Sequence, residues 1–80
     1  MYYYVYILRS KSYPQKYYTG YTTDLEKRLT KHNEGGCKHT SKNKPWEIKT
    51  AIAFTEKEKA LKFEKYLKTH SGRAFAVKHF

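Results

Sequence analysis

The sequence predicts an α+β fold: a small three-stranded antiparallel sheet flanked by helices, in the order β-β-α-β-α-α. Three observations lead to this prediction. Aromatic and β-branched runs recur along the chain, helix-capping patterns separate them, and 80 residues are too few for two hydrophobic cores. We therefore expect one domain that spans residues 1–80.

The strands are expected where aromatic and β-branched residues cluster. Residues 2–10 (YYYVYILRS) and 16–22 (KYYTGYT) form the first two, with Pro14 in the turn between them. Gly20 inside the second strand indicates either a bulge or a close approach to its backbone. Residues 46–54 (WEIKTAIAF) alternate enough in polarity to form the third strand.

Capping patterns locate the helices. The TDLE sequence at 23–26 predicts a helix from about Asp24 to Asn33, which ends at a Gly-Gly pair. The TEKE sequence at 55–58 opens a second helix, and an HSGR sequence interrupts it. Residues 73–80 are interpreted as a short terminal helix rather than a strand.

The composition is strongly basic and aromatic. Lysine and arginine number 17 against seven acidic residues, which gives a formal net charge of +10, and the chain has nine Tyr, four Phe and one Trp. Such a domain favours a polyanionic partner, most often nucleic acid, although a basic protein that is merely soluble is the alternative. With one cysteine and no membrane-spanning apolar run, the chain is expected in the cytoplasm, away from membranes.

Charged side chains occupy helix faces that should be apolar. In the first helix, Leu25 and Leu29 mark the apolar face by their spacing. Arg28 and His32 lie on or beside that face, where arginine could snorkel to water and histidine could be a hydrogen-bonded structural residue. In the second helix Glu64 lies inside the apolar face, where an unpaired carboxylate is costly.

Two arrangements would satisfy these charges. Arg28 and Glu64 could form a partly buried ion pair, which would be purely structural. Alternatively, the edge of the sheet carries a polar site in which Glu64 holds a divalent metal and Arg28 faces a phosphate. Tyr6 on the first strand and Tyr18 on the second fit such a site, although tyrosines in strands more often serve packing.

Five segments resemble the GIY-YIG nuclease domain, and in particular its small stand-alone bacterial members of the UPF0213 kind. They are YVY (4–6), YTG (18–20), TTDLEKRLTKHN (22–33), KPWEI (44–48) and EKALKFEKYLK (58–68). The resemblance covers nearly the whole chain and implies a GIY-YIG-like fold. The first motif lacks its glycine and the second has Thr19 at its middle position, but both keep their tyrosine.

The resemblance implies a metal-dependent endonuclease that hydrolyses phosphodiester bonds in DNA and is structure-specific or related to DNA repair. Tyr6 would be the general base or would orient the attacking water. Tyr18 would contact the scissile phosphate or its water. Gly20 would let the strand backbone pack tightly beside the site.

The resemblance assigns the remaining roles to residues of the two expected helices. Arg28 would stabilise the charge that develops on the phosphate, and His32 belongs to the same catalytic group with a less defined role. Glu64 would hold one Mg²⁺ or Mn²⁺ ion, and no small-molecule cofactor is implied. A single carboxylate suffices, because Mg²⁺ keeps most of its waters.

DNA contacts are assigned by position, against the alternative that each lysine is simply solvated. The basic residues chosen are Lys42, Lys44, Lys65, Lys68 and Arg73. Because the chain lacks the extra DNA-binding module of many family nucleases, cleavage could be weak or a partner protein could supply specificity. Two other functions stay open: a non-catalytic nucleic-acid-binding module that keeps the fold, and a basic partner-binding domain.

Overall fold

The chain forms one antiparallel sheet from three strands. The computed structural model describes residues 1–80 and contains β1 (Tyr3–Ser10), β2 (Tyr17–Thr22) and β3 (Trp46–Phe54), in the spatial order β2-β1-β3. Each expected strand lies within one residue of its sequence prediction. With the helices below, the predicted α+β class and the order β-β-α-β-α-α are confirmed.

Three α-helices accompany the sheet: α1 (Leu25–Asn33), α2 (Lys57–Leu67) and α3 (His70–His79). A short 3₁₀ helix, η1 (Ser41–Asn43), lies in the loop before β3. The terminal segment is therefore helical, as expected. None of these helices has the length and apolar character that crossing a bilayer requires.

The helix caps differ from the sequence prediction by one residue. Asp24, not Thr23, caps α1: its side chain accepts a hydrogen bond from the backbone N–H of Lys27 at 3.1 Å. Glu56 occupies the N-cap position of α2 and makes no side-chain capping bond. Serine, threonine and aspartate are all good caps, so adjacent candidates such as Thr23 and Asp24 are not separated by sequence alone.

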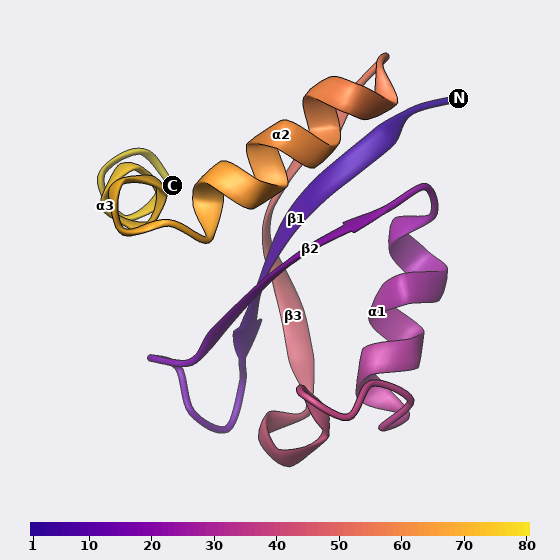
Figure 1. Cartoon of the computed structure of the whole chain (residues 1–80). Helices are drawn as coiled ribbons and strands as arrows, with labels where there is room; N and C mark the ends of the chain where they lie inside the picture. Colours follow the sequence, from indigo (N-terminus) through magenta and orange to yellow (C-terminus); the bar gives the residue numbers. More distant parts are fainter.

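The helices cover opposite faces of the sheet. Figure 1 shows α1 on one side of the strands, with α2 and α3 on the other. Leu25 and Leu29 of α1 pack against a cluster that contains Tyr6 and Leu8. Val5 and other β1 side chains of the opposite face form a second cluster with α2 and α3. The two faces of β1 therefore belong to two separate parts of the core.

Candidate active site

Tyr6 is the centre of a buried polar chain on the α1 face. Its side chain is 1% exposed, although its hydroxyl is polar. The Nε of Arg28 donates a hydrogen bond to this hydroxyl at 3.2 Å, and the Nε2 of His32 lies 2.9 Å from it. The structure thus brings together three of the residues that the sequence selected, from a strand and from one helix.

This series of hydrogen bonds continues from His32 into the loop before β3. The Nδ1 of His32, itself fully buried, lies 2.8 Å from the Oγ1 of Thr40. The Thr40 hydroxyl donates its hydrogen to the carbonyl oxygen of Cys37 at 3.2 Å. Because a hydroxyl has one hydrogen, Thr40 accepts from the imidazole, and His32 carries its proton on Nδ1.

This assignment fixes the direction of the bond between Tyr6 and His32. With Nε2 unprotonated, the Tyr6 hydroxyl donates to His32 while it accepts from Arg28. In the reverse arrangement the Tyr6 hydrogen would be buried without an acceptor, which is costly. No buried side-chain nitrogen or oxygen of the protein lacks a partner. The neutral imidazole is therefore placed to receive the tyrosine proton.

Thr40 is a site residue that the sequence did not reveal. Its side chain is 1% exposed, and its carbonyl oxygen accepts a hydrogen bond from the Nε1 of Trp46 at 2.8 Å. Asn33, at the end of α1, in turn donates to the carbonyl oxygen of Trp46 at 3.0 Å. The start of β3 thereby fixes both α1 and the loop that orients His32. Nothing in the polar segment around Thr40 distinguishes it from its neighbours.

Gly20 lies directly opposite Tyr6 in the β1–β2 pairing. A Cβ atom built at Gly20 would overlap the Tyr6 hydroxyl and its ring. The close approach expected at Gly20 is therefore present. The alternative of a bulge there is wrong, because the β1–β2 register is regular and the irregularity of β1 lies between Ile7 and Leu8, on its β3 side.

We expect Gly20→Ala to lower the free energy of unfolding by about 1–3 kcal/mol, because the added methyl group must displace a buried, hydrogen-bonded tyrosine. Urea unfolding of the purified variant measures this loss. Equal stability of Gly20→Ala and the wild type would contradict the close approach.

Burial and mutual contact shift the pKa values of the three hydrogen-bonded residues Tyr6, Arg28 and His32. Burial raises the pKa of Tyr6 above 10.0, and the hydrogen bond and charge of Arg28 only partly oppose this effect. Burial, and then the charge of Arg28, lower the pKa of His32 below 6.5. The hydrogen bond to Tyr6 raises the pKa of Arg28. In the free protein the tyrosine is thus a phenol, and the imidazole is neutral at pH 7.

The depressed pKa of His32 predicts a pH-dependent stability. The unfolded chain takes up the His32 proton near pH 6.5 and the folded chain only at lower pH, so stability rises with pH between the two values. The contribution is complete above pH 6.5 and is lost as pH falls through the folded-state pKa. Urea unfolding from pH 8 to pH 5 measures it. A His32→Asn variant with the same pH profile as the wild type would contradict this prediction.

Tyr18 extends the site to the sheet edge. Its ring centroid lies 6.5 Å from that of Tyr6 and 5.1 Å from the centre of the His32 ring. Tyr18 is half-buried on the edge strand β2, and it also lines a cavity on the α2/α3 side. It therefore connects the polar chain under α1 with the opposite face of the molecule.

Glu64 does not pair with Arg28. Its carboxylate accepts a hydrogen bond from the ammonium group of Lys68 at 3.1 Å, one turn along α2, and its side chain is 20% exposed. The alternative of an Arg28–Glu64 ion pair is wrong. The physical reason is that α1 and α2 cover opposite faces of the sheet, which helix periodicity does not reveal.

Among the site residues predicted from the sequence, Glu64 is the one carboxylate for the expected metal ion. No three His, Cys, Asp or Glu side chains gather into a cluster that could hold a metal by themselves. Mg²⁺ is compatible with this, because it takes one or two carboxylates and completes its coordination with water and substrate phosphates. Glu64 fits that requirement as a partly exposed carboxylate, but Lys68 must first leave it.

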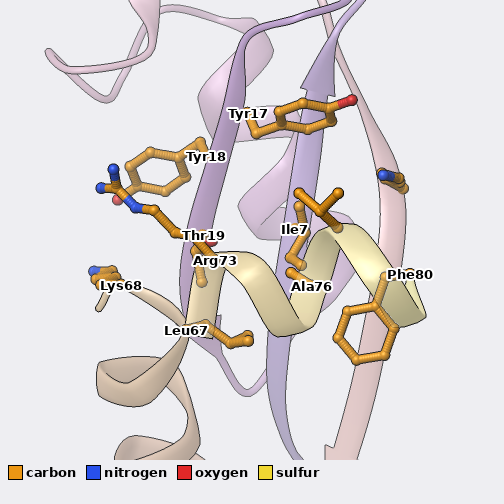
Figure 2. Close-up of a pocket in the computed structure, with 11 residues that line it drawn as sticks. Ile7, Tyr17, Tyr18, Thr19, Leu67, Lys68, Arg73, Ala76 and Phe80 are labelled. Carbon is orange, nitrogen blue, oxygen red and sulfur yellow. The ribbon is translucent and has the colours of Figure 1, made fainter. Parts of the chain in front are cut away.

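The basic residues selected for DNA contacts separate into two groups. Lys68 and Arg73 line the same cavity, beside Tyr18 (Figure 2). The other three side chains, Lys42, Lys44 and Lys65, are exposed and lie outside that cavity.

Comparison with known sequences gives consistent matches. Residues 2–77 match the family model described as the GIY-YIG catalytic domain. A UPF0213 protein of Halalkalibacterium halodurans is 42% identical over 74 residues, which span 91% of this chain and 77% of that protein. The UPF0213 protein YazA of Bacillus subtilis is 39% identical over 64 residues, or 79% of this chain and 63% of YazA.

Two further matches concern a longer protein and a solved structure. Structure-specific endonuclease subunit slx1 of Talaromyces marneffei is 42% identical over 69 residues, which span 79% of this chain but only 18% of slx1. The solution NMR structure of a UPF0213 protein from Bacillus halodurans superimposes with a TM-score of 0.58 at 37% identity. The superposition covers 98% of this chain and 84% of the chain in the solved structure.

Proposed function

The chain belongs to the GIY-YIG family, and on that premise we propose that it is a metal-dependent endonuclease that hydrolyses phosphodiester bonds in DNA. The observation that carries the proposal is the buried chain from Arg28 through Tyr6 to His32. Structural packing alone does not require a tyrosine, an arginine and a neutral imidazole in series. The similarity to slx1, whose name describes a structure-specific endonuclease subunit, favours DNA with a branched or flapped structure.

Arg28 is suited to hold the scissile phosphate. Only its Nε is engaged, by Tyr6, and its terminal nitrogens make no hydrogen bond within the protein. A guanidinium group binds two oxygens of one phosphate through such free donors. Arg28 would stabilise the negative charge that grows on the non-bridging oxygens as the water attacks, which is electrostatic catalysis of the oxyanion type.

Tyr6 and His32 provide a route for the proton of the attacking water. As the water oxygen bonds to phosphorus, the bond to the leaving oxygen breaks and that oxygen takes a proton from solvent. The water proton passes to the Tyr6 hydroxyl, which Arg28 must uncover as it turns to the phosphate, because Tyr6 is 1% exposed in the free protein. The tyrosine hands its own proton to Nε2 of His32, which becomes imidazolium. Tyr18, at the accessible edge, would orient the water or the phosphate beside them. Such a relay needs a neutral imidazole, which the lowered pKa of His32 supplies.

Glu64 would hold the Mg²⁺ or Mn²⁺ ion. Glu64 and Arg28 lie on opposite faces of the sheet, so the shared phosphate would lie at the sheet edge, where Tyr18 contacts His32 on one side and the cavity lined by Lys68 on the other. When bound there, the ion would supply positive charge to the phosphate, and one carboxylate suffices to hold it because Mg²⁺ keeps most of its waters. Lys68 neutralises the Glu64 carboxylate in the free protein, so metal binding must displace it.

A cleavage panel tests the proposal. Purified protein is incubated with Mn²⁺ or Mg²⁺ and with labelled duplex, flapped, branched and single-stranded DNA, and with EDTA as the metal-free control. We expect metal-dependent nicking of at least one branched or flapped substrate. Salt-sensitive binding without cleavage of any substrate would instead identify a non-catalytic nucleic-acid-binding module, and no salt-sensitive binding would leave a basic partner-binding domain.

A further inference from the structure

A cavity of about 610 Å³ opens on the face of the sheet that α2 and α3 cover. Figure 2 shows α3 along one wall and strands β1 and β2 along the other. Its volume falls in the range of small-molecule sites, of about 300–1,000 Å³. Tyr6, Arg28, His32 and Glu64 do not line this cavity, and of the residues given a role in the chemistry only Tyr18 reaches it.

The lining combines an apolar floor with a basic rim. Leu67, Ile7 and Phe80 are among the apolar residues, whereas the charged ones are all cationic: Lys49, Lys68 and Arg73. No acidic side chain lines the cavity. A site of this kind matches a ligand that joins an apolar body to a negative charge, because a purely apolar peptide would gain nothing from the positive charge of the rim.

Two tyrosines of β2 give the cavity aromatic surfaces. The ammonium group of Lys49 lies 4.8 Å from the ring centre of Tyr17. Tyr18 lines the same cavity and also packs against His32 at 5.1 Å between ring centres. A ligand in the cavity therefore contacts Tyr18, the residue proposed to orient the water or the scissile phosphate. Aromatic rings with nearby cations are the surfaces on which unpaired bases stack.

We propose that this cavity binds one unpaired nucleotide of the DNA substrate. The base lies on the apolar floor against the β2 tyrosines, and its phosphate meets Lys68 and Arg73. A paired base does not enter such a cavity, because both its faces are stacked and its edge is hydrogen-bonded within the duplex. The inference rests on the proposed nuclease function and names its substrate class as DNA with an unpaired nucleotide next to the cleaved bond.

Binding in EDTA tests the cavity without cleavage. The two probes are a duplex with a short single-stranded flap and the matching continuous duplex. The flapped DNA carries 2-aminopurine at the first unpaired position of its flap. We expect the wild type to bind the flapped DNA about tenfold more tightly than the duplex. The fluorescence of 2-aminopurine should fall as the base stacks. Equal affinity for the two DNAs would overturn the proposal.

Variants on α3 localise the effect. Val77 lines the cavity but is 84% exposed, so Val77→Trp can narrow its mouth without disturbing the core. This variant and Arg73→Ala should bind flapped DNA no better than duplex. The matched controls, Ala74→Trp and Lys78→Ala, change exposed residues outside the cavity and should keep the preference. Wild-type preference in Val77→Trp would overturn the proposal.

The outcome is separable from that of the nuclease proposal. If flap preference depends on Val77 but Mn²⁺ supports no cleavage, the cavity assignment stands and the nuclease proposal fails. If the protein cleaves DNA while Val77→Trp and the wild type show the same preference in EDTA, the cavity assignment fails and the nuclease proposal stands.

Discussion

Tyr6→Phe is expected to lower the rate of metal-dependent DNA cleavage by about 10²–10⁴-fold, the usual contribution of a positioned proton-transfer group. The phenylalanine ring keeps the packing against Leu8 and Trp46 but lacks the hydroxyl that joins Arg28 to His32. Without that oxygen, the water proton has no route to the imidazole. Single-turnover cleavage of a flapped DNA, with enzyme in excess, measures the effect on the chemical step.

The same variant should lose stability, which must be separated from the loss of rate. Removing the hydroxyl leaves the Nε2 of His32 unpaired in a buried site, at a cost of about 1–3 kcal/mol. Cleavage is therefore measured well below the midpoint of thermal unfolding. Tyr4→Phe is the matched control, because Tyr4 lies two residues away on the same strand face and its hydroxyl makes no hydrogen bond within the protein. Cleavage by folded Tyr6→Phe at the wild-type rate would contradict the relay.

The strands could be predicted because their signal is local. Aromatic and β-branched residues alternate in β1, and the alternation assigns Tyr6 and Val5 to opposite faces, which the two core clusters confirm. The match to the family model over residues 2–77 likewise confirms the resemblance seen in the tyrosine motifs. Helix α1 was located equally well, since Leu25 and Leu29 face the sheet as their spacing predicts.

The pairing of charges could not be predicted in the same way. Periodicity shows that Arg28 and Glu64 lie on the inner faces of their helices, but it does not say which face of the sheet each helix covers. Arg28 in fact meets Tyr6, and Glu64 meets Lys68 on the same helix. A lysine four residues after a glutamate is a common surface pair, and this local partner was available in the sequence.

The orientation of His32 depends on contacts that are distant in sequence. Tyr6 lies 26 residues away, and Thr40, eight residues away, is in a loop without regular periodicity. Whether a histidine beside an apolar stripe is structural or reactive depends on what its two nitrogens contact. Only the folded chain supplies that information, because Trp46 of β3 fixes the backbone of Thr40.

Glu64→Ala is expected to lower metal-dependent cleavage by about 10³-fold, because a bound divalent ion contributes several kcal/mol of charge stabilisation at the phosphate. Stability should hardly change. Lys68, the partner of Glu64, is half-exposed, and pairs of this kind contribute about 0–1 kcal/mol. Cleavage rates over a range of Mn²⁺ concentrations, together with thermal unfolding, measure both effects. Glu56→Ala is the matched control, since Glu56 pairs with Lys59 at 3.3 Å on the same helix.

Lys68 makes the role of Glu64 testable without cleavage. If the carboxylate holds the metal, the ion and the ammonium group compete for it, so Lys68→Ala should bind Mn²⁺ about two- to fivefold more tightly in a paramagnetic-resonance titration. Lys59→Ala, which removes the partner of Glu56 instead, should bind Mn²⁺ as weakly as the wild type. Because Lys68 also lines the cavity beside Tyr18, a phosphate that draws its ammonium group away would expose Glu64 to the metal. Unchanged Mn²⁺ affinity in Lys68→Ala, with full cleavage in Glu64→Ala, would contradict a metal site at this glutamate.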